Sequence, residues 1–294
     1  MLKTIGMLAL FTAGKSINTV CVKLAQRGAK SNLFQHILFV QLFSVLQALL
    51  LFTLPPYKAL EFSPERLLLP FLFGTFYIVY MVLTVMALEA GPASLTYIIG
   101  SFCSVVPIFA GLLFWGDTLS LWQGIGLVLF CLSLYLFNSG SYSDSAVKKP
   151  ITPRWVFLAL AALAFAGMAV TCTRRYCDLY PGYVKEYLFI AFMSSAAWAI
   201  PFTGYALVKK GLLGVSGRML GYTALAALLV DVSNIIFMIY ASAFSAAFYY
   251  PLTSVLGVVG VALGSYIFLR ERVSRRALIG IVVAAAALAL LAMS

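Results

Sequence analysis

Runs of about 20 consecutive apolar residues recur along this sequence, and turn residues or charged residues bound each run. Backbone N–H and C=O groups must find their hydrogen-bond partners within the segment when lipid surrounds it, so such runs are expected to be helices. The chain is 63% hydrophobic and only 10% charged, a composition far from that of a soluble domain. The sequence therefore predicts an all-α polytopic membrane protein.

We expect ten transmembrane helices, which form two groups of five. The apolar runs lie near residues 2–24, 33–54, 67–89, 93–115, 119–138, 154–174, 185–208, 217–241, 245–269 and 275–293. The longest polar stretch, residues 139–153, lies near the midpoint of the chain. We interpret it as a linker between a first five-helix repeat, residues 1–138, and a second five-helix repeat, residues 154–294.

An internal similarity supports this duplication. Residues 91–126 align with residues 245–280 at an offset of 245 − 91 = 154. The shared frame is F-x-x-[DE]-x-x-S-x5-G, in which Asp117 meets Glu271 and Ser120 meets Ser274. Because these acids fall at predicted helix ends, we interpret them as structural, capping or gating residues and not as ligands of a substrate.

The odd number of helices in each half has a topological consequence. A duplicated five-helix unit enters the membrane in the opposite sense, so the halves would be inverted repeats around a central cavity near the midplane. The predicted connections on the side away from the termini carry more than twice as many Lys and Arg residues as those on the other side. The positive-inside rule then favours termini that lie outside the cell.

Two charged residues lie inside apolar runs and not at their ends. Lys15 is near the middle of the first run, and Asp231 is near the middle of the eighth. A charge at the bilayer centre costs about 2.5–3.5 kcal/mol, and such residues usually face a cavity or a partner. We expect these two to bind substrate, with Asp231 the candidate for proton coupling; the alternative is a structural ion pair between them.

Neighbouring polar and aromatic residues favour the functional interpretation. Asn18 and Asn234 follow the two charged residues by three positions, which places each pair on one helix face. The repeat offset sets Tyr77 and Tyr80 opposite Asp231 and Asn234, although aromatic residues at helical spacing also serve packing or the membrane interface. The predicted substrate-binding residues are Lys15, Asn18, Tyr77, Tyr80, Tyr97, Trp198, Asp231, Asn234 and Tyr249.

Several function classes are not supported by the sequence. The cations lie singly or in pairs at the ends of apolar runs, which is typical of membrane anchoring and not of nucleic-acid binding. The five cysteines form no CxxC pair, and the single His36 cannot build a metal site, so we expect no metal and no cofactor. The motifs HExxH, GxSxG and GxxxxGK[ST] do not occur. We therefore expect no enzyme and no ATP-driven pump.

The chain resembles the EamA-like, ten-helix branch of the drug/metabolite transporter superfamily. The resemblance rests on the length, the five-plus-five repeat, the frames LLFWGDTLSLWQGIGLVL and SYIFLRERVSRRALIGIVV, and the segment ALEAGPASLTYIIGSFCSVVPIFAGLLFWGD. It implies an alternating-access carrier in a membrane, such as the bacterial cytoplasmic membrane. It also implies cytoplasmic termini, in conflict with the cation count.

The leading hypothesis is a secondary active transporter of a small polar or zwitterionic metabolite such as an amino acid, driven by protons or by exchange. Lys15 would meet a carboxylate, and Asp231 would meet an ammonium group or carry the proton. Alternatives are a choline-like quaternary-amine carrier, an organic-anion exchanger, and a membrane scaffold or lipid-handling protein without a solute cavity. The expected partners are the substrate and the lipid bilayer, and the sequence leaves open whether the protein is a monomer or a dimer.

Overall fold

The computed structural model describes residues 6, 7, 10–14, 17, 21, 33–54, 62–91, 96, 99–141, 151–210, 217–241, 244–269 and 275–292. This part of the chain contains helices and no strand. The elements are α2 (Leu33–Leu50), η1 (Leu51–Thr53), α3 (Pro64–Ala90), η2 (Phe102–Val105), α5 (Val106–Phe114), α6 (Leu121–Ser141), α7 (Pro153–Leu179), α8 (Val184–Lys210), α9 (Gly217–Ala241), α10 (Ala246–Leu269) and α11 (Arg275–Leu291). We call α2–α6 the first half and α7–α11 the second half.

The helices confirm an all-helical membrane architecture. By length and composition, four can cross a membrane, namely Pro64–Ala90, Pro153–Leu179, Val184–Tyr205 and Met219–Ala241. Shorter apolar helices cover Ile37–Thr53, Ile99–Phe114, Leu121–Leu136 and Leu278–Leu291. Many large apolar side chains, including Leu113, Val128 and Phe157, are exposed on the outside of the bundle, as expected where lipid is the solvent.

Local sequence signals set several helix starts. Pro64 and Pro153 occupy the first turns of α3 and α7, where a missing backbone N–H costs nothing. At α6, Ser120 and Gln123 form a reciprocal capping box: the Gln123 N–H donates to Ser120 Oγ (3.3 Å), and the Ser120 N–H donates to Gln123 Oε1 (3.0 Å). The Ser of the repeat frame is therefore a helix cap in the first half.

One predicted boundary is wrong. The sixth apolar run was expected to end near residue 174, which placed Arg174 and Arg175 in a connection, but α7 continues to Leu179. The long side chain of arginine can lie along apolar surface while its charged end reaches polar surroundings. A helix can therefore continue through arginines that follow an apolar run. Arg174 and Asp178 are consequently held in place by a rigid helix.

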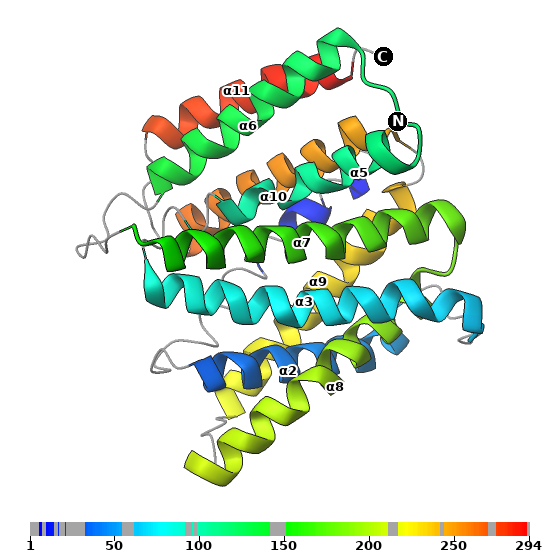
Figure 1. Ribbon diagram of the computed structural model, residues 1–294, viewed down its shortest axis with the longest axis vertical. Coiled ribbons are helices and arrows are strands. Elements are labelled where there is room, and N and C mark those ends of the chain that lie inside the picture. Colours follow the sequence, from blue (N-terminus) through cyan, green and yellow to red (C-terminus); the bar gives the residue numbers. More distant parts are fainter. Residues whose placement is uncertain are drawn as a thin grey trace.

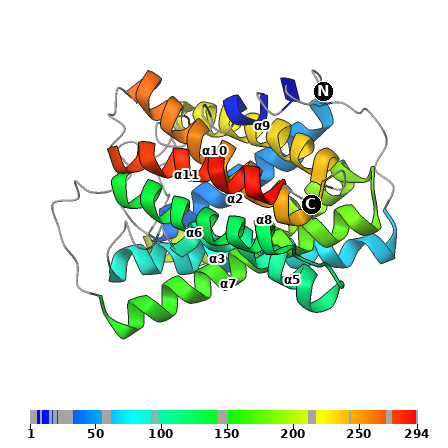
Figure 2. The ribbon, with the colours of Figure 1, turned by 90° about the horizontal axis from the view of Figure 1, so that it is seen from above.

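The helices pack in a defined order (Figure 1). Helix α3 lies between α7 and α8, α2 packs against α8 and α9, and α5 contacts both α7 and α10. Helices α6 and α11 lie side by side, as Figure 1 and Figure 2 both show. The apolar clusters at these contacts draw residues from both halves; one of them joins α2 to α7, α8, α9 and α10. The two halves thus share the core of the bundle.

Candidate functional site

Asp231 lies inside the bundle on α9 and has no exposed surface. Gln47 on α2 donates its Nε2 hydrogen to Asp231 Oδ1, with a donor–acceptor distance of 3.3 Å. Among the described residues, neither Asp231 Oδ2 nor Gln47 Oε1 has a hydrogen-bond partner. A carboxylate group in a membrane helix, with one oxygen still open to a proton or a ligand, has the character of a functional residue.

Gln47 belongs to a polar seam on α2 that the sequence analysis missed. Gln41, Ser44 and Gln47 recur at intervals of three residues and so share one helix face. Gln41 Nε2 donates to the carbonyl oxygen of Ala196 (3.3 Å), and the hydroxyls of Ser44 and Ser195 lie 3.4 Å apart. Their regular spacing within an apolar run would have been enough to predict a polar face on this helix. The seam links α2 of the first half to the second half.

The predicted aromatic stripe of α3 is a row of contacting rings. Phe73 stacks on Tyr77 with ring centroids 5.8 Å apart, and Tyr77 contacts Tyr80 at 6.3 Å. Tyr77 packs against the same apolar cluster as Leu229 and Val230 of α9, the residues that precede Asp231. Helix α3 packs mainly against α7 and α8, so the position of Tyr77 opposite Asp231 and a binding role for the tyrosines both stay predictions.

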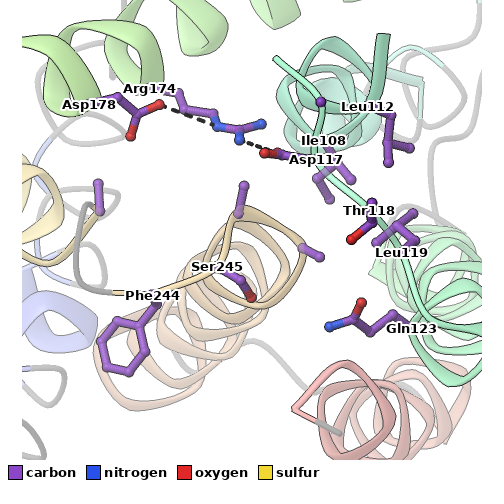
Figure 3. Close-up of a pocket in the computed structure, with 14 residues that line it drawn as sticks. Ile108, Leu112, Asp117, Thr118, Leu119, Gln123, Arg174, Asp178, Phe244 and Ser245 are labelled. Atoms are coloured by element: carbon purple, nitrogen blue, oxygen red, sulfur yellow. Dashed lines mark hydrogen bonds and ion pairs between the residues drawn. The ribbon is translucent and has the colours of Figure 1, made fainter. Parts of the chain in front are cut away.

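A separate cavity of about 490 Å³ lies at one end of the bundle (Figure 3). Both halves line it: Ile108, Leu112 and the segment from Gly116 to Leu119 come from the first half, and Arg174, Asp178 and the start of α10 come from the second. Gln123, the residue of the α6 capping box, also lines this cavity. Pockets of this volume accommodate small metabolites.

Arg174 is the central charged residue of this cavity. Its Nη2 pairs with Asp117 Oδ2, and its Nη1 donates to the carbonyl oxygen of Pro107. Its Nε lies 3.9 Å from Asp178 Oδ2, and its guanidinium carbon lies 4.9 Å from the ring centroid of Trp115. The dashed lines of Figure 3 mark the two ion pairs. The sequence analysis assigned Asp117 a structural or gating role but did not identify Arg174 as its partner.

Comparison with known proteins gives a match to one family. Residues 3–139, a little less than half of the chain, match the EamA-like transporter family. This confirms the resemblance drawn from the sequence, because this family is part of the drug/metabolite transporter superfamily. The EamA-like match and the apolar helices together support an integral membrane protein. A search of curated proteins gave no match.

The whole chain also has the fold of a protein of known structure. One crystal structure of a protein superimposes on this chain with a TM-score of 0.70 at 14% sequence identity. The superposition covers 100% of this chain and 97% of the other. At this identity the likeness concerns the fold alone. It extends the similarity beyond residues 3–139 to the helices of the second half.

Three other predicted site residues make contacts that packing explains. Tyr249 is buried and donates its hydroxyl to the carbonyl oxygen of Phe237 at 2.7 Å. Trp198 is exposed on α8 and donates its indole N–H to Thr75 Oγ1 at 2.9 Å. Asn234 is half-buried one helical turn beyond Asp231. Any role of these three residues in binding stays a prediction.

Lys15, Asn18 and Tyr97 lie outside the described residues. Gly14, which precedes Lys15 in the sequence, lies against α9. A Cβ atom at Gly14 would come within 2.5 Å of Ser233 Oγ and 3.2 Å of the Leu229 carbonyl oxygen. Ile17 packs in the same cluster as Tyr77. Within the described part of the chain, no group of three or more His, Cys, Asp or Glu side chains could hold a metal ion.

Proposed function

We propose that this protein is a secondary active transporter that moves a small polar or zwitterionic metabolite, such as an amino acid, by alternating access. Coupling would be to protons or to exchange, and the membrane would be the cytoplasmic membrane of a bacterium. The observation that carries the proposal is Asp231, which is wholly buried in α9 with one carboxylate oxygen open among the described residues. Ionisable groups in such positions mark substrate or proton pathways.

The packing order supports two inverted repeats of five helices. If the two halves are matched in sequence order, α2 corresponds to α8, α3 to α9, α5 to α10 and α6 to α11. Helices α2, α5 and α6 each pack against their own counterpart, and the contact of α3 with α8 is matched by the contact of α9 with α2. Such an exchange symmetry is what an approximate two-fold axis in the membrane plane produces. It favours alternating access by movement of one half against the other.

The position of Asp231 supports a coupling role. Gln47 of the first half donates to this carboxylate of the second half, so the charge of Asp231 affects a contact between the halves. An ionised carboxylate accepts that hydrogen bond more strongly than a neutral one. Protonation, or the arrival of an ammonium group, would therefore change the free energy of the packed arrangement.

Uptake by the purified protein in proteoliposomes tests the proposal. We expect an imposed pH gradient to drive uptake of a zwitterion, or internal solute to exchange with external solute. Asp231→Asn removes the charge at constant size, and we expect it to abolish gradient-driven uptake. Thr223→Val is the matched control, because Thr223 is equally buried on α9 but donates to its own helix, to the Met219 carbonyl oxygen at 2.7 Å. Native uptake by Asp231→Asn would refute the assignment.

A ligand screen separates the substrate classes. Ligands that bind the folded state raise the thermal midpoint by mass action, so a weak substrate in excess registers. We expect amino acids to stabilise the native protein more than quaternary amines or organic anions do. Stabilisation by choline alone would favour an amine carrier, and stabilisation by anions alone would favour an anion exchanger. The absence of stabilisation and of transport across all three classes would favour the scaffold hypothesis.

A further inference from the structure

Arg174 joins the two halves at the end of the bundle where the large cavity lies. Its ion pair runs from α7, in the second half, to Asp117 in the segment between α5 and α6 of the first. Its second bond, to the carbonyl oxygen of Pro107, also reaches the first half. Only 9% of the Arg174 side chain is exposed. The halves cannot separate at this end unless these bonds break.

Two acidic and two basic side chains interact beside this cavity: Asp117, Asp178, Arg174 and Arg175. The side chains of Asp117 and Asp178 are 38% and 39% exposed, and both line the cavity. Asp178 lies 3.9 Å from Arg174 Nε, which is beyond hydrogen-bond distance. Asp178 also interacts electrostatically with Arg175, so two cations balance two carboxylates, and the cavity has room for a solute beside them.

Two further features provide polar groups without an internal partner. Tyr250, only 2% exposed, interacts electrostatically with Arg174 and Asp178, and its hydroxyl has no hydrogen-bond partner among the described residues. The first turn of α10 lines the cavity at Ala246 and Ala247. The first backbone N–H groups of a helix have no acceptor within the helix and favour negative charge.

From these contacts we infer that the cavity is an access site for zwitterionic solutes, in which the solute exchanges with the Arg174–Asp117 ion pair. The solute carboxylate takes the place of Asp117 on Arg174, and the solute ammonium group binds Asp117 and Asp178. This inference rests on the proposed transport function and adds a second site to it, apart from Asp231. Occupation of the site breaks the link between the halves that holds this end closed.

The exchange favours zwitterions for an electrostatic reason. Every charge of the cluster has an opposite partner before a zwitterion binds and again after it has bound. A simple amine has no group to pair with Arg174, and a simple acid displaces Asp117 without supplying a cation for it. Because Arg174 is itself buried, a state that leaves its charge without an anion is strongly unfavourable. The cluster therefore discriminates by the presence of both charges on one molecule.

Isothermal titration calorimetry on the full chain in detergent tests the site with three probes that share an isobutyl group: L-leucine, 3-methylbutylamine and 4-methylpentanoate. We expect leucine to bind the native protein most tightly. Asp117→Asn frees Arg174 at constant size, so affinity for the acid should rise about tenfold while affinity for the amine falls about tenfold. Arg174→Gln should give the opposite change, with a gain for the amine and a loss for leucine.

Arg175→Gln provides the matched control. Arg175 is the next residue of α7 and also lies over the Trp115 ring, at 5.3 Å, but it does not line the cavity. Because Arg175 interacts with Asp178 but not with the solute carboxylate, its removal should raise affinity for the amine slightly and leave affinity for the acid and the preference for leucine unchanged. Should Arg174→Gln not fold, Arg174→Lys keeps the charge without the planar fork and is expected to weaken leucine binding while sparing the preference for zwitterions.

Three outcomes would overturn the inference. The first is equal weakening of all three probes by Asp117→Asn, which is what a purely structural ion pair predicts. The second is a failure of all three probes to bind the native chain. The third is loss of uptake in Asp231→Asn while Asp117→Asn and Arg174→Gln keep the native KM for leucine; in that case the proposed transport function stands and the access site does not.

Discussion

Gln47 on α2 donates a hydrogen bond to Asp231 on α9, with Nε2 and Oδ1 3.3 Å apart. Both side chains are buried, and they come from opposite halves of the chain. The contact therefore holds the membrane-embedded carboxylate to a helix of the other half. Its contribution to stability and its contribution to transport can be measured separately.

A double-mutant cycle at this pair makes the separation. We expect Gln47→Leu to lower the free energy of unfolding by about 1–3 kcal/mol, because a buried carboxylate loses its donor. The double variant Gln47→Leu/Asp231→Leu should recover most of that loss, since both polar groups are then replaced, yet it should not transport. Unfolding in mixed micelles and uptake in proteoliposomes measure the two effects. Additive losses of stability would show that the pair is not coupled.

The Arg66–Glu186 ion pair is expected to be a major stabilising contact between α3 and α8. Arg66 Nε lies 3.2 Å from Glu186 Oε1, the Arg66 guanidinium lies 3.8 Å from the Tyr183 ring centroid, and Glu186 is buried. Arg66→Met should cost about 3–5 kcal/mol, because it leaves Glu186 as an uncompensated buried charge. Thermal unfolding in detergent measures the loss. Arg154→Met, at an exposed position of α7, is the control and should change stability by less than about 0.5 kcal/mol.

Gly111 lies against the ion pair between the halves. A Cβ atom there would overlap Asp117 Oδ2 and Arg174 Nη1 and force both side chains to move. Gly111→Ala should destabilise the protein by about 1–3 kcal/mol through overpacking and weaken the ion pair between the halves. Gly124→Ala, where a Cβ atom meets nothing within 4 Å, should stabilise α6 instead, by up to about 1 kcal/mol. Opposite signs in thermal unfolding are the expected result, and equal effects would contradict it.

The Trp155–Thr96 hydrogen bond joins the start of α7 to the first half. Trp155 Nε1 donates to Thr96 Oγ1 at 2.9 Å, and both residues are buried. A cycle of Trp155→Phe and Thr96→Val should give a coupling energy of about 0.6 kcal/mol, with about 1.7 kcal/mol as the upper bound for such bonds in membranes. Trp122→Phe, at an exposed position of α6, supplies the reference for loss of an indole. A coupling energy of zero would show that the bond contributes nothing measurable.

The helices were largely predictable from the sequence. The run predicted at 217–241 coincides with α9, and the run predicted at 185–208 differs from α8 by one residue at its start and two at its end. Lipid requires continuous apolar residues and internal backbone hydrogen bonds, so length and hydropathy alone locate such helices. The predicted end of the sixth run was wrong, because α7 continues through charged residues to Leu179.

The candidate sites were predictable only in part. Asp231 was identified because a carboxylate within an apolar run is costly wherever the helix packs. Its partner Gln47 is an uncharged residue 184 positions away in the sequence, and the importance of Gln47 depends on the packing of α2 against α9. Arg174 was assigned to a connection, and only its position within α7 brings it to Asp117.

The sequence by itself determined that this chain is a helical membrane protein, where most of its helices lie, and that Asp231 is buried among them. These properties follow from the free energy of transferring each residue from water to lipid, and the order of apolar residues along the chain is enough to estimate it. Only the tertiary structure decided that Gln47 faces Asp231, and that Arg174, Asp117 and Asp178 meet at a cavity between the halves. Contacts between distant helices depend on which faces pack together, and nearly uniform apolar helices carry little sequence information about that choice.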